Sequence, residues 1–316
     1  MDWFANSRLF ELARTGRRVT PIWAAIPLAF VFSYAAQFGA LPVLVAVVIL
    51  YGTSGTPLPL DRMSATEAGF WMAAFLISAF ALVYVLTGAW VLLYEKRPFR
   101  TLGYERGGSL KRYARGFLLG IVIFGVAAGI LAAAGAVAIE KGDPSKQGTA
   151  AIAGVLLVLA GWVVQGGAEE LVTRGWALPV IAVRSRPWLG LALSSLLFAA
   201  MHSLNENLSA LALVNLALFG IFAGLYAMRE GSLWGISALH AAWNWAEGNL
   251  FGFEVSGMQA GGGALWNLTG TGPDWLTGGM FGPEGGAAVS AALLIGIAVV
   301  LWGRRGASKQ ILGSNR

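Results

Sequence analysis

The sequence predicts an all-α protein, a polytopic transmembrane helix bundle. Of its 316 residues, 57% are hydrophobic and only 12% are charged, whereas about a quarter of the residues are charged in soluble domains. The mean hydropathy is +0.66, and apolar runs of about 20 residues, the length at which a helix crosses a bilayer, recur along the chain. The alternating ten-residue segments typical of membrane β-barrels are absent from the sequence. There is no cysteine, so disulfides and thiolate metal sites are excluded.

The apolar runs predict about eight spans. They cover residues 21–50, 67–94, 115–139, 148–184, 187–204, 208–228, 232–251 and 286–303. The first and fourth runs exceed the length needed to cross, so each is expected to tilt, break or project. The expected places to bend are Pro42 in the first run and Gly161, Gly166 and Gly167 in the fourth. Residues 1–20 mix arginines with large apolar side chains, which predicts a short amphipathic helix at the membrane surface.

Basic residues segregate between the two sides of the predicted bundle. When successive loops are assigned to alternate sides, all but three of the 22 Lys and Arg fall on one side. Only Arg62, Lys141 and Lys146 fall on the other. The positive-inside rule therefore predicts that both termini are cytoplasmic. The net charge of +6 is explained by topology and by contact with anionic membrane lipid, so we expect no nucleic-acid partner.

The chain divides into five predicted regions. They are an amphipathic cytoplasmic N-terminus (1–20), N-terminal membrane helices (21–146), a catalytic core (147–251), a glycine-rich outer loop (252–285), and a last span with a basic tail (286–316). The outer loop is expected to be solvated, with an ordered cap or lid over the bundle as the alternative. Glycines at four-residue spacing are expected to let helices approach closely. They are Gly116 and Gly120, Gly125 and Gly129, and Gly220 and Gly224.

Charged and polar residues interrupt the apolar runs at three places in the second half of the chain. A charged side chain at the centre of a bilayer costs about 2.5–3.5 kcal/mol, so each needs a structural or chemical reason. The segments are Glu169-Glu170 with Arg174, Phe198-Ala-Ala-Met-His202, and His240 with Asn244, which share a helix face at four-residue spacing.

Counting residues from the basic ends of the spans shows whether these side chains can meet. At 1.5 Å per residue, Glu169 lies roughly 22 Å deep, His202 roughly 24 Å, His240 roughly 16 Å and Asn244 roughly 22 Å. Residues from three spans therefore converge on one layer of the membrane. The sequence predicts one site there.

Each residue also has a purely structural explanation. Glu170 and Arg174 are four residues apart. This spacing suits a helix ion pair, which lowers the cost of burial, better than it suits a catalytic couple. A single buried histidine serves equally well as a hydrogen bond between helices. Asn215 is expected to be such a packing group, and Glu247, near the outer end of its span, is expected to reach water.

The motifs EExxxR, FxxxH and HxxxN, in this order on successive helices, resemble the CPBP family of type II CAAX prenyl endopeptidases and bacterial Abi-like membrane proteins. The resemblance covers about residues 148–251. It implies proteolysis within the membrane, with Glu169 and His202 activating water and His240 and Asn244 lining an oxyanion site. Glu170 would orient Arg174 or help to hold the site together.

We therefore expect an intramembrane endopeptidase acting on a hydrophobic, membrane-associated or lipidated peptide, in a multi-pass protein of the plasma membrane if the source is bacterial. The alternative is a non-proteolytic protein of the same fold, such as a bacteriocin-immunity or scaffold factor. A transporter would also place charges at mid-bilayer, but it predicts symmetric halves, and the motifs occur in the second half alone.

The cofactor is left open. Glu169, His202 and His240 match a catalytic zinc site in ligand type and number, and the family is often classed among the metalloproteases. Against zinc, no HExxH motif is present and the three candidates come from three helices. The residue chemistry slightly favours water activation without a metal.

Overall fold

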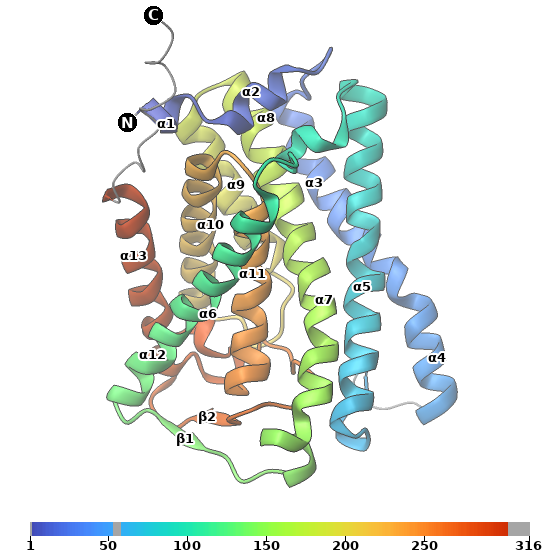
Figure 1. Ribbon diagram of the computed structural model, residues 1–316, viewed down its shortest axis with the longest axis vertical. Coiled ribbons are helices and arrows are strands. Elements are labelled where there is room, and N and C mark those ends of the chain that lie inside the picture. The colour runs from blue at the N-terminus through green and yellow to red at the C-terminus, as the bar shows by residue number, and fades with distance from the viewer. Residues whose placement is uncertain (1, 53–57, 303–316) are drawn as a thin grey trace, which may run out of the picture.

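The computed structural model describes residues 2–52 and 58–302, and these form a bundle of helices with one pair of short strands (Figure 1). The long helices are α3 (Ile22–Ala36) with α4 (Leu41–Tyr51), α5 (Ala65–Trp90), α6 (Ser109–Ala133), α7 (Ile152–Glu170) with α8 (Leu178–Arg184), α9 (Pro187–Met201), α10 (Ala210–Glu230), α11 (Trp234–Trp245) and α13 (Ala287–Trp302). The short elements are α1 (Asp2–Ala5), α2 (Arg8–Arg14), α12 (Asp274–Thr277), β1 (Val137–Ile139) and β2 (Leu268–Gly270). The predicted basic tail lies outside the described residues.

Each predicted apolar run forms helix, which confirms the all-α fold class. Within residues 2–52 and 58–302, five helical segments are long and apolar enough to cross a membrane, namely Ile22–Tyr51, Ala65–Glu95, Ser109–Ala133, Gly148–Arg184 and Ala210–Glu230. Helices α9 and α13 have 15 and 16 residues, or roughly 22–24 Å, which is less than the bilayer core of about 30 Å. The chain is an integral membrane protein. The count of eight spans and the cytoplasmic termini stay predictions.

The two long runs break in different ways. A 3₁₀ turn at Gln37–Ala40 separates α3 from α4, and Pro42 lies in the first turn of α4, as expected. In the fourth run, however, α7 passes through its glycines unbroken and widens into a π-helix at Leu171–Ala177. The α-helical pattern of the fourth run therefore changes after the glycines and not at them. These glycines are contact points instead, since a Cβ on Gly166 would lie 2.8 Å from the Ala241 nitrogen.

Small residues bring α6 against α11. A Cβ on Gly116 would lie 1.9 Å from the Gly235 carbonyl oxygen, and one on Gly120 would lie 2.3 Å from the Leu239 carbonyl oxygen. The same expectation is wrong for Gly125 and Gly129, which have no described atom within 4 Å of a built Cβ. Five residues separate Gly120 from Gly125, so at about 100° per residue the second pair lies on a different face of the helix.

A second glycine pair, Gly220 and Gly224 on α10, meets α9. A Cβ on each would lie 2.7 Å from Ser195 and 2.4 Å from Leu191. The close approach predicted for this pair is confirmed.

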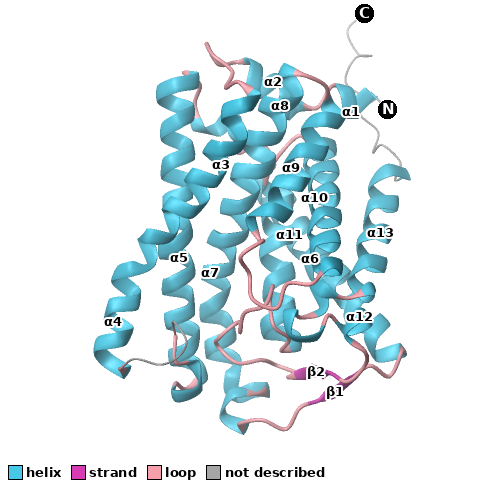
Figure 2. Cartoon of the chain, turned by 180° about the vertical axis from the view of Figure 1, so that it is seen from behind, coloured by secondary structure: helices cyan, strands magenta, loops and turns pink. Residues whose placement is uncertain are grey.

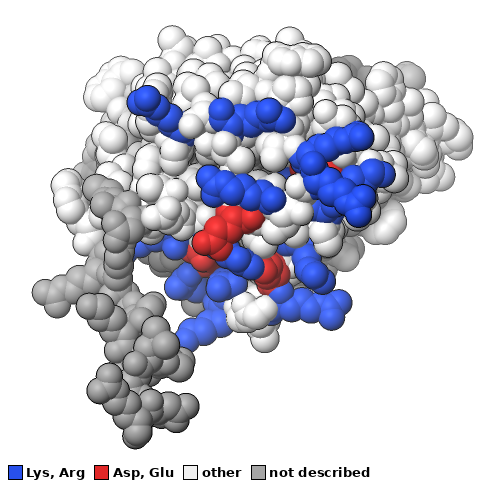
Figure 3. Space-filling model, turned by 90° about the horizontal axis from the view of Figure 1, so that it is seen from above, with Lys and Arg blue, Asp and Glu red and all other residues white. Residues whose placement is uncertain are grey.

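The N-terminal amphipathic helix forms as predicted, but its apolar face packs on the protein. Leu9, Phe10 and Leu12 of α2 are buried against α8 and the turn Phe99–Leu102. Arg8 anchors the helix by donating two hydrogen bonds, at 3.1 and 3.0 Å, to the carboxylate of Glu105. These bonds hold the pKa of Glu105 below its usual value. Figure 3 shows that lysines and arginines gather on this end of the bundle, in keeping with the predicted segregation of charge.

The 252–285 segment is folded against the opposite end of the bundle, so its interpretation as a solvated loop is wrong (Figure 2). Strand β2 pairs antiparallel with β1, with Ala138 opposite Thr269. The glycines serve tight turns, since Gly261, Gly262 and Gly263 all have positive φ. The carbonyls of Gly261 and Gly263 accept hydrogen bonds of 2.7 and 3.0 Å from the Asn249 amide. Backbone polar groups are thus satisfied within the protein.

Candidate active site

The polar motifs meet in one cavity of about 220 Å³ enclosed by α3, α5, α7, α9, α10, α11 and the 252–285 segment. Four of the sequence-predicted residues line it, namely Glu169, His202, His240 and Asn244. The other two, Glu170 and Arg174, lie behind the cavity wall with no exposed surface. The predicted convergence on one layer is therefore present in the fold.

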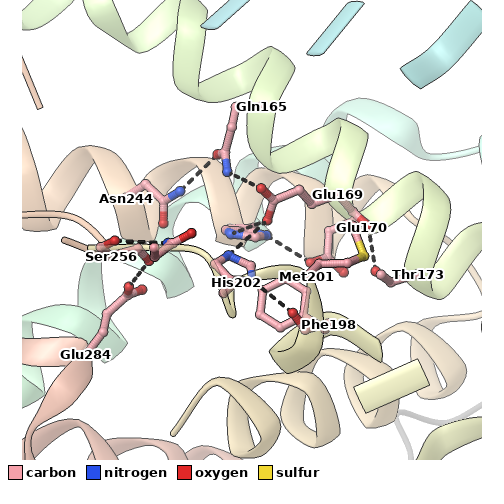
Figure 4. Close-up of polar contacts among 12 residues, drawn as sticks. Gln165, Glu169, Glu170, Thr173, Phe198, Met201, His202, Asn244, Ser256 and Glu284 are labelled. Carbon is pink, nitrogen blue, oxygen red and sulfur yellow. Dashed lines mark hydrogen bonds and ion pairs between the residues drawn. The ribbon is translucent and has the colours of Figure 1, made fainter. Parts of the chain in front are cut away.

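Glu169, the last residue but one of α7, has one carboxylate oxygen bound and the other free. Its Oε1 accepts a hydrogen bond of 2.7 Å from Gln165 Nε2. Its Oε2 accepts none from any described residue, yet it faces Nε2 of His202 at 3.9 Å and Nε2 of His240 at 3.8 Å (Figure 4). These distances are too long for direct hydrogen bonds, and polar gaps of this length are commonly bridged by water.

His202 follows the last residue of α9, so the helix ends just before it and does not continue to residue 204. Its Nδ1 lies 2.8 Å from the Phe198 carbonyl oxygen. A carbonyl only accepts hydrogen bonds, so Nδ1 carries the proton. In the neutral form of the ring, Nε2 therefore presents its lone pair to the cavity and to Glu169.

His240 is held by the charged pair behind the cavity. Its Nδ1 lies 2.8 Å from Glu170 Oε1, and Arg174 donates a hydrogen bond of 2.9 Å to the same oxygen. The predicted ion pair between Glu170 and Arg174 is present, and the Arg174 guanidinium also lies 4.4 Å from the centre of the Phe198 ring. A carboxylate only accepts, so Nδ1 of His240 is protonated and Nε2 points into the cavity.

Gln165, which the sequence interpretation missed, links Asn244 to Glu169. Asn244 Nδ2 donates a hydrogen bond of 2.9 Å to Gln165 Oε1, and Gln165 Nε2 donates to Glu169. The carboxylate can only accept, so the orientation of both amides is fixed. The sequence contains a pattern that predicts this contact, since Gln165 is a polar residue in an apolar run and lies four positions before Glu169, on the same helix face.

A tyrosine from the basic end of the bundle supports α7 behind the candidate residues. Tyr104 donates a hydrogen bond of 3.3 Å to the Gly167 carbonyl and shares one of 2.8 Å with Ser237 Oγ. Burial raises the pKa of Tyr104, so its hydroxyl stays protonated and able to donate.

The 252–285 segment adds residues that the sequence interpretation did not assign to the site. Glu284 Oε1 accepts a hydrogen bond of 2.9 Å from Trp243 Nε1, and its other oxygen accepts one from Ser256 Oγ. Asn215 is confirmed as a packing group, because its amide donates to the Glu284 and Gly286 carbonyls. Glu247 does not reach water, since it has no exposed surface.

The candidate zinc ligands lie farther apart in this arrangement than a tetrahedral zinc site requires. Zinc bonds of about 2.0–2.1 Å place tetrahedral oxygen and nitrogen ligands roughly 3.4 Å apart, whereas Glu169 Oε2 is 3.9 and 3.8 Å from the two histidine nitrogens. In the described part of the chain, no three His, Asp or Glu side chains are positioned to hold a metal ion.

Residues 150–246 match the family model described as type II CAAX prenyl endopeptidase Rce1-like. This segment is therefore similar to the Rce1-like family. It contains all three motifs, so the resemblance to the CPBP family that they indicated is confirmed over this part of the chain. No curated protein matches the chain. The Rce1-like segment begins in the turn before α7 and ends just after α11, and it supplies every residue that the motifs singled out.

Proposed function

We propose that this chain is an intramembrane endopeptidase that hydrolyses a peptide bond in a hydrophobic, membrane-associated or lipidated substrate. The observation that carries the proposal is the free Oε2 of Glu169, which faces two imidazole nitrogens at 3.8 and 3.9 Å inside a cavity. An acceptor-rich gap of this size suits a water molecule. The Rce1-like match supports the same class of activity at the level of the family.

In the proposed reaction, Glu169 removes one proton from this water. The Nε2 lone pair of His202 accepts a hydrogen bond from the other O–H group and so orients the water. The oxygen attacks the carbonyl carbon of the substrate, and a tetrahedral intermediate forms. The carbon–nitrogen bond then breaks, and the proton held by Glu169 passes to the leaving amine. General base and acid catalysis of this kind contributes typically 10²–10⁴-fold.

Asn244 and His240 are the proposed donors to the oxyanion. Asn244 Nδ2 has two N–H groups and gives one to Gln165, so the second remains for a ligand. His240 donates a hydrogen bond from its Nδ1 to Glu170. When the ring carries a second proton, its Nε2 can donate a hydrogen bond to the oxyanion. That proton balances the cluster, because two glutamates, Arg174 and one imidazolium sum to zero charge.

Glu170 serves the proposed site through His240. Its Oε1 fixes the ring orientation of His240 and is itself held by Arg174. Loss of Glu170 would leave the buried Arg174 without its partner, and breaking a buried pair in this way costs about 3–5 kcal/mol.

The test compares membrane-associated peptides of cells that make the wild-type protein with those of cells that make Glu169→Gln, His202→Ala or the double variant. Glu254→Gln is the matched control, because Glu254 is an exposed acid that does not line the cavity. If Glu169 and His202 act on one water, either single change abolishes cleavage and the double is little worse. Cleavage that survives both single changes would contradict the assigned roles. No wild-type cleavage would instead support the non-proteolytic alternative.

A further inference from the structure

The cavity extends past the histidines to a wall made by the 252–285 segment. Val255, Ser256, Met258 and Glu284 of this segment line the same cavity as the candidate catalytic residues. Figure 4 shows Ser256 and Glu284 on the side of His202 away from Glu169 and Glu170. A substrate lying across the water site therefore meets this wall.

Hydrogen bonds hold the wall in place against two elements of the site. Asn205, three residues after His202, donates a bond of 3.0 Å to the Ser256 carbonyl. Within the segment, the Gly257 nitrogen donates a bond of 2.9 Å to the Phe281 carbonyl. Trp243, which comes three residues after His240 on α11, fixes Glu284. Glu284 thus has a defined position relative to both histidines.

No ion pair neutralises the Glu284 carboxylate in the described part of the protein. Among the described residues that line the cavity, Glu169 and Glu284 are acidic and none is Lys or Arg. The two side chains that bond the Glu284 carboxylate, Trp243 and Ser256, are neutral donors, and no described cation forms an ion pair with it. Each carboxylate oxygen accepts more than one hydrogen bond, so Glu284 can still accept from a ligand.

We propose that Glu284 is a specificity-determining residue that binds a basic residue, Lys or Arg, of the peptide substrate. This inference rests on the proposed function and names the substrate class. Most of the remaining cavity wall is apolar and aromatic, including Phe75, Phe80 and Phe219, so the neighbouring substrate residues are apolar. Glu284 adds a negative charge beside a cluster that is neutral when His240 is an imidazolium, and this charge disfavours an acidic residue at the same place in the substrate.

The experiment uses sets of apolar peptides. Within a set, the peptides differ at one position, which carries Lys, the uncharged norleucine, or Glu. Successive sets vary a different position along the peptide. Cleavage is measured as kcat/KM with the full chain in proteoliposomes. Binding of the same peptides is measured with the Glu169→Gln variant, which cannot cleave under the proposed mechanism. Glu284→Gln removes the charge, and its single amide oxygen can still accept from Trp243 while its NH2 group can donate to the Ser256 hydroxyl oxygen. Glu254→Gln removes a charge from the same segment outside the cavity.

At one position of the peptide we expect the wild-type protein to prefer Lys to norleucine by about tenfold or more, because one added ion pair worth about 1.4 kcal/mol changes the ratio tenfold. Glu284→Gln should reduce this ratio to about one, and Glu254→Gln should leave it unchanged. Equal use of Lys and norleucine at every position, or equal loss in both variants, overturns the inference.

The two proposals fail differently. Cleavage without a Lys preference refutes the role of Glu284 and leaves the endopeptidase standing. Binding that prefers Lys and depends on Glu284, without cleavage by the wild-type protein, refutes the endopeptidase and supports the basic-residue site.

Discussion

Replacing Gln165 by Met separates the positioning of the proposed base from the base itself. Methionine keeps the length of the side chain but removes the donor to Glu169 and the acceptor for Asn244. A hydrogen bond to a charged group contributes about 1.5–3 kcal/mol, and one between neutral groups about 0.5–1.5 kcal/mol. If both act in the transition state, a loss of about 2–4 kcal/mol lowers kcat roughly 30- to 10³-fold.

The assay measures kcat and KM in proteoliposomes together with thermal unfolding in detergent. Gln37→Met is the matched control, because Gln37 lines the same cavity but bonds only the Ser33 carbonyl in its own helical segment. We expect Gln165→Met to reduce kcat far more than it changes KM, and Gln37→Met to leave kcat near the wild-type value. A Gln165→Met protein within threefold of wild-type kcat would refute the idea that this amide chain positions the base.

Four further predictions follow from the fold. Gly116→Ala places a Cβ 1.9 Å from a carbonyl oxygen of α11 and should lower the free energy of unfolding by about 1–3 kcal/mol. Gly125→Ala has no described neighbour within 4 Å and should instead raise it by up to about 1 kcal/mol, because alanine favours a helix interior over glycine. Arg8 lowers the pKa of Glu105. At pH values above the ordinary pKa of Glu105, this exposed pair should therefore stabilise the fold by about 0.2–1 kcal/mol, and the effect should disappear as the pH falls through the lowered pKa. The difference in melting temperature between wild type and Glu105→Gln should shrink over the same pH range. Exhaustive chelation should leave activity intact, and one zinc per chain whose removal abolishes activity and whose return restores it would contradict the metal-free mechanism. Reporter fusions at the N-terminus and at 260–280 should report opposite sides of the membrane, and the same side for both would contradict the span count.

Hydropathy predicted the helices, and a polar residue within an apolar span stands out from its neighbours. The depth of each motif in the membrane could be counted because a helix advances by a fixed rise per residue, and these depths predicted that the motifs meet. The same arithmetic could not assign roles within the pair Glu169-Glu170. Adjacent residues on a helix point about 100° apart, and only the packing shows that Glu169 lines the cavity while Glu170 lies behind it. The catalytic roles themselves stay predictions.

The sequence could not reveal the wall of the cavity. Gly261, Gly262 and Gly263 look like a flexible stretch in composition, but their positive φ angles and their contacts with Asn249 and α7 depend on tertiary packing. Glu284 likewise gains its place at the cavity only through Trp243 and Ser256. Local patterns carry little information about such long-range contacts.

The π-helix at Leu171–Ala177 has a consequence for comparing this chain with others. A π turn holds about one residue more than an α turn, so a homologue with one residue fewer here could form an unbroken α-helix. The downstream helix would then rotate by about 100° relative to Glu169 and Glu170, and Trp176 would lose its hydrogen bond of 3.0 Å to Glu95. An alignment of this region should therefore place a one-residue gap inside 171–177, because a gap before Glu169 would shift the carboxylates out of register with the histidines.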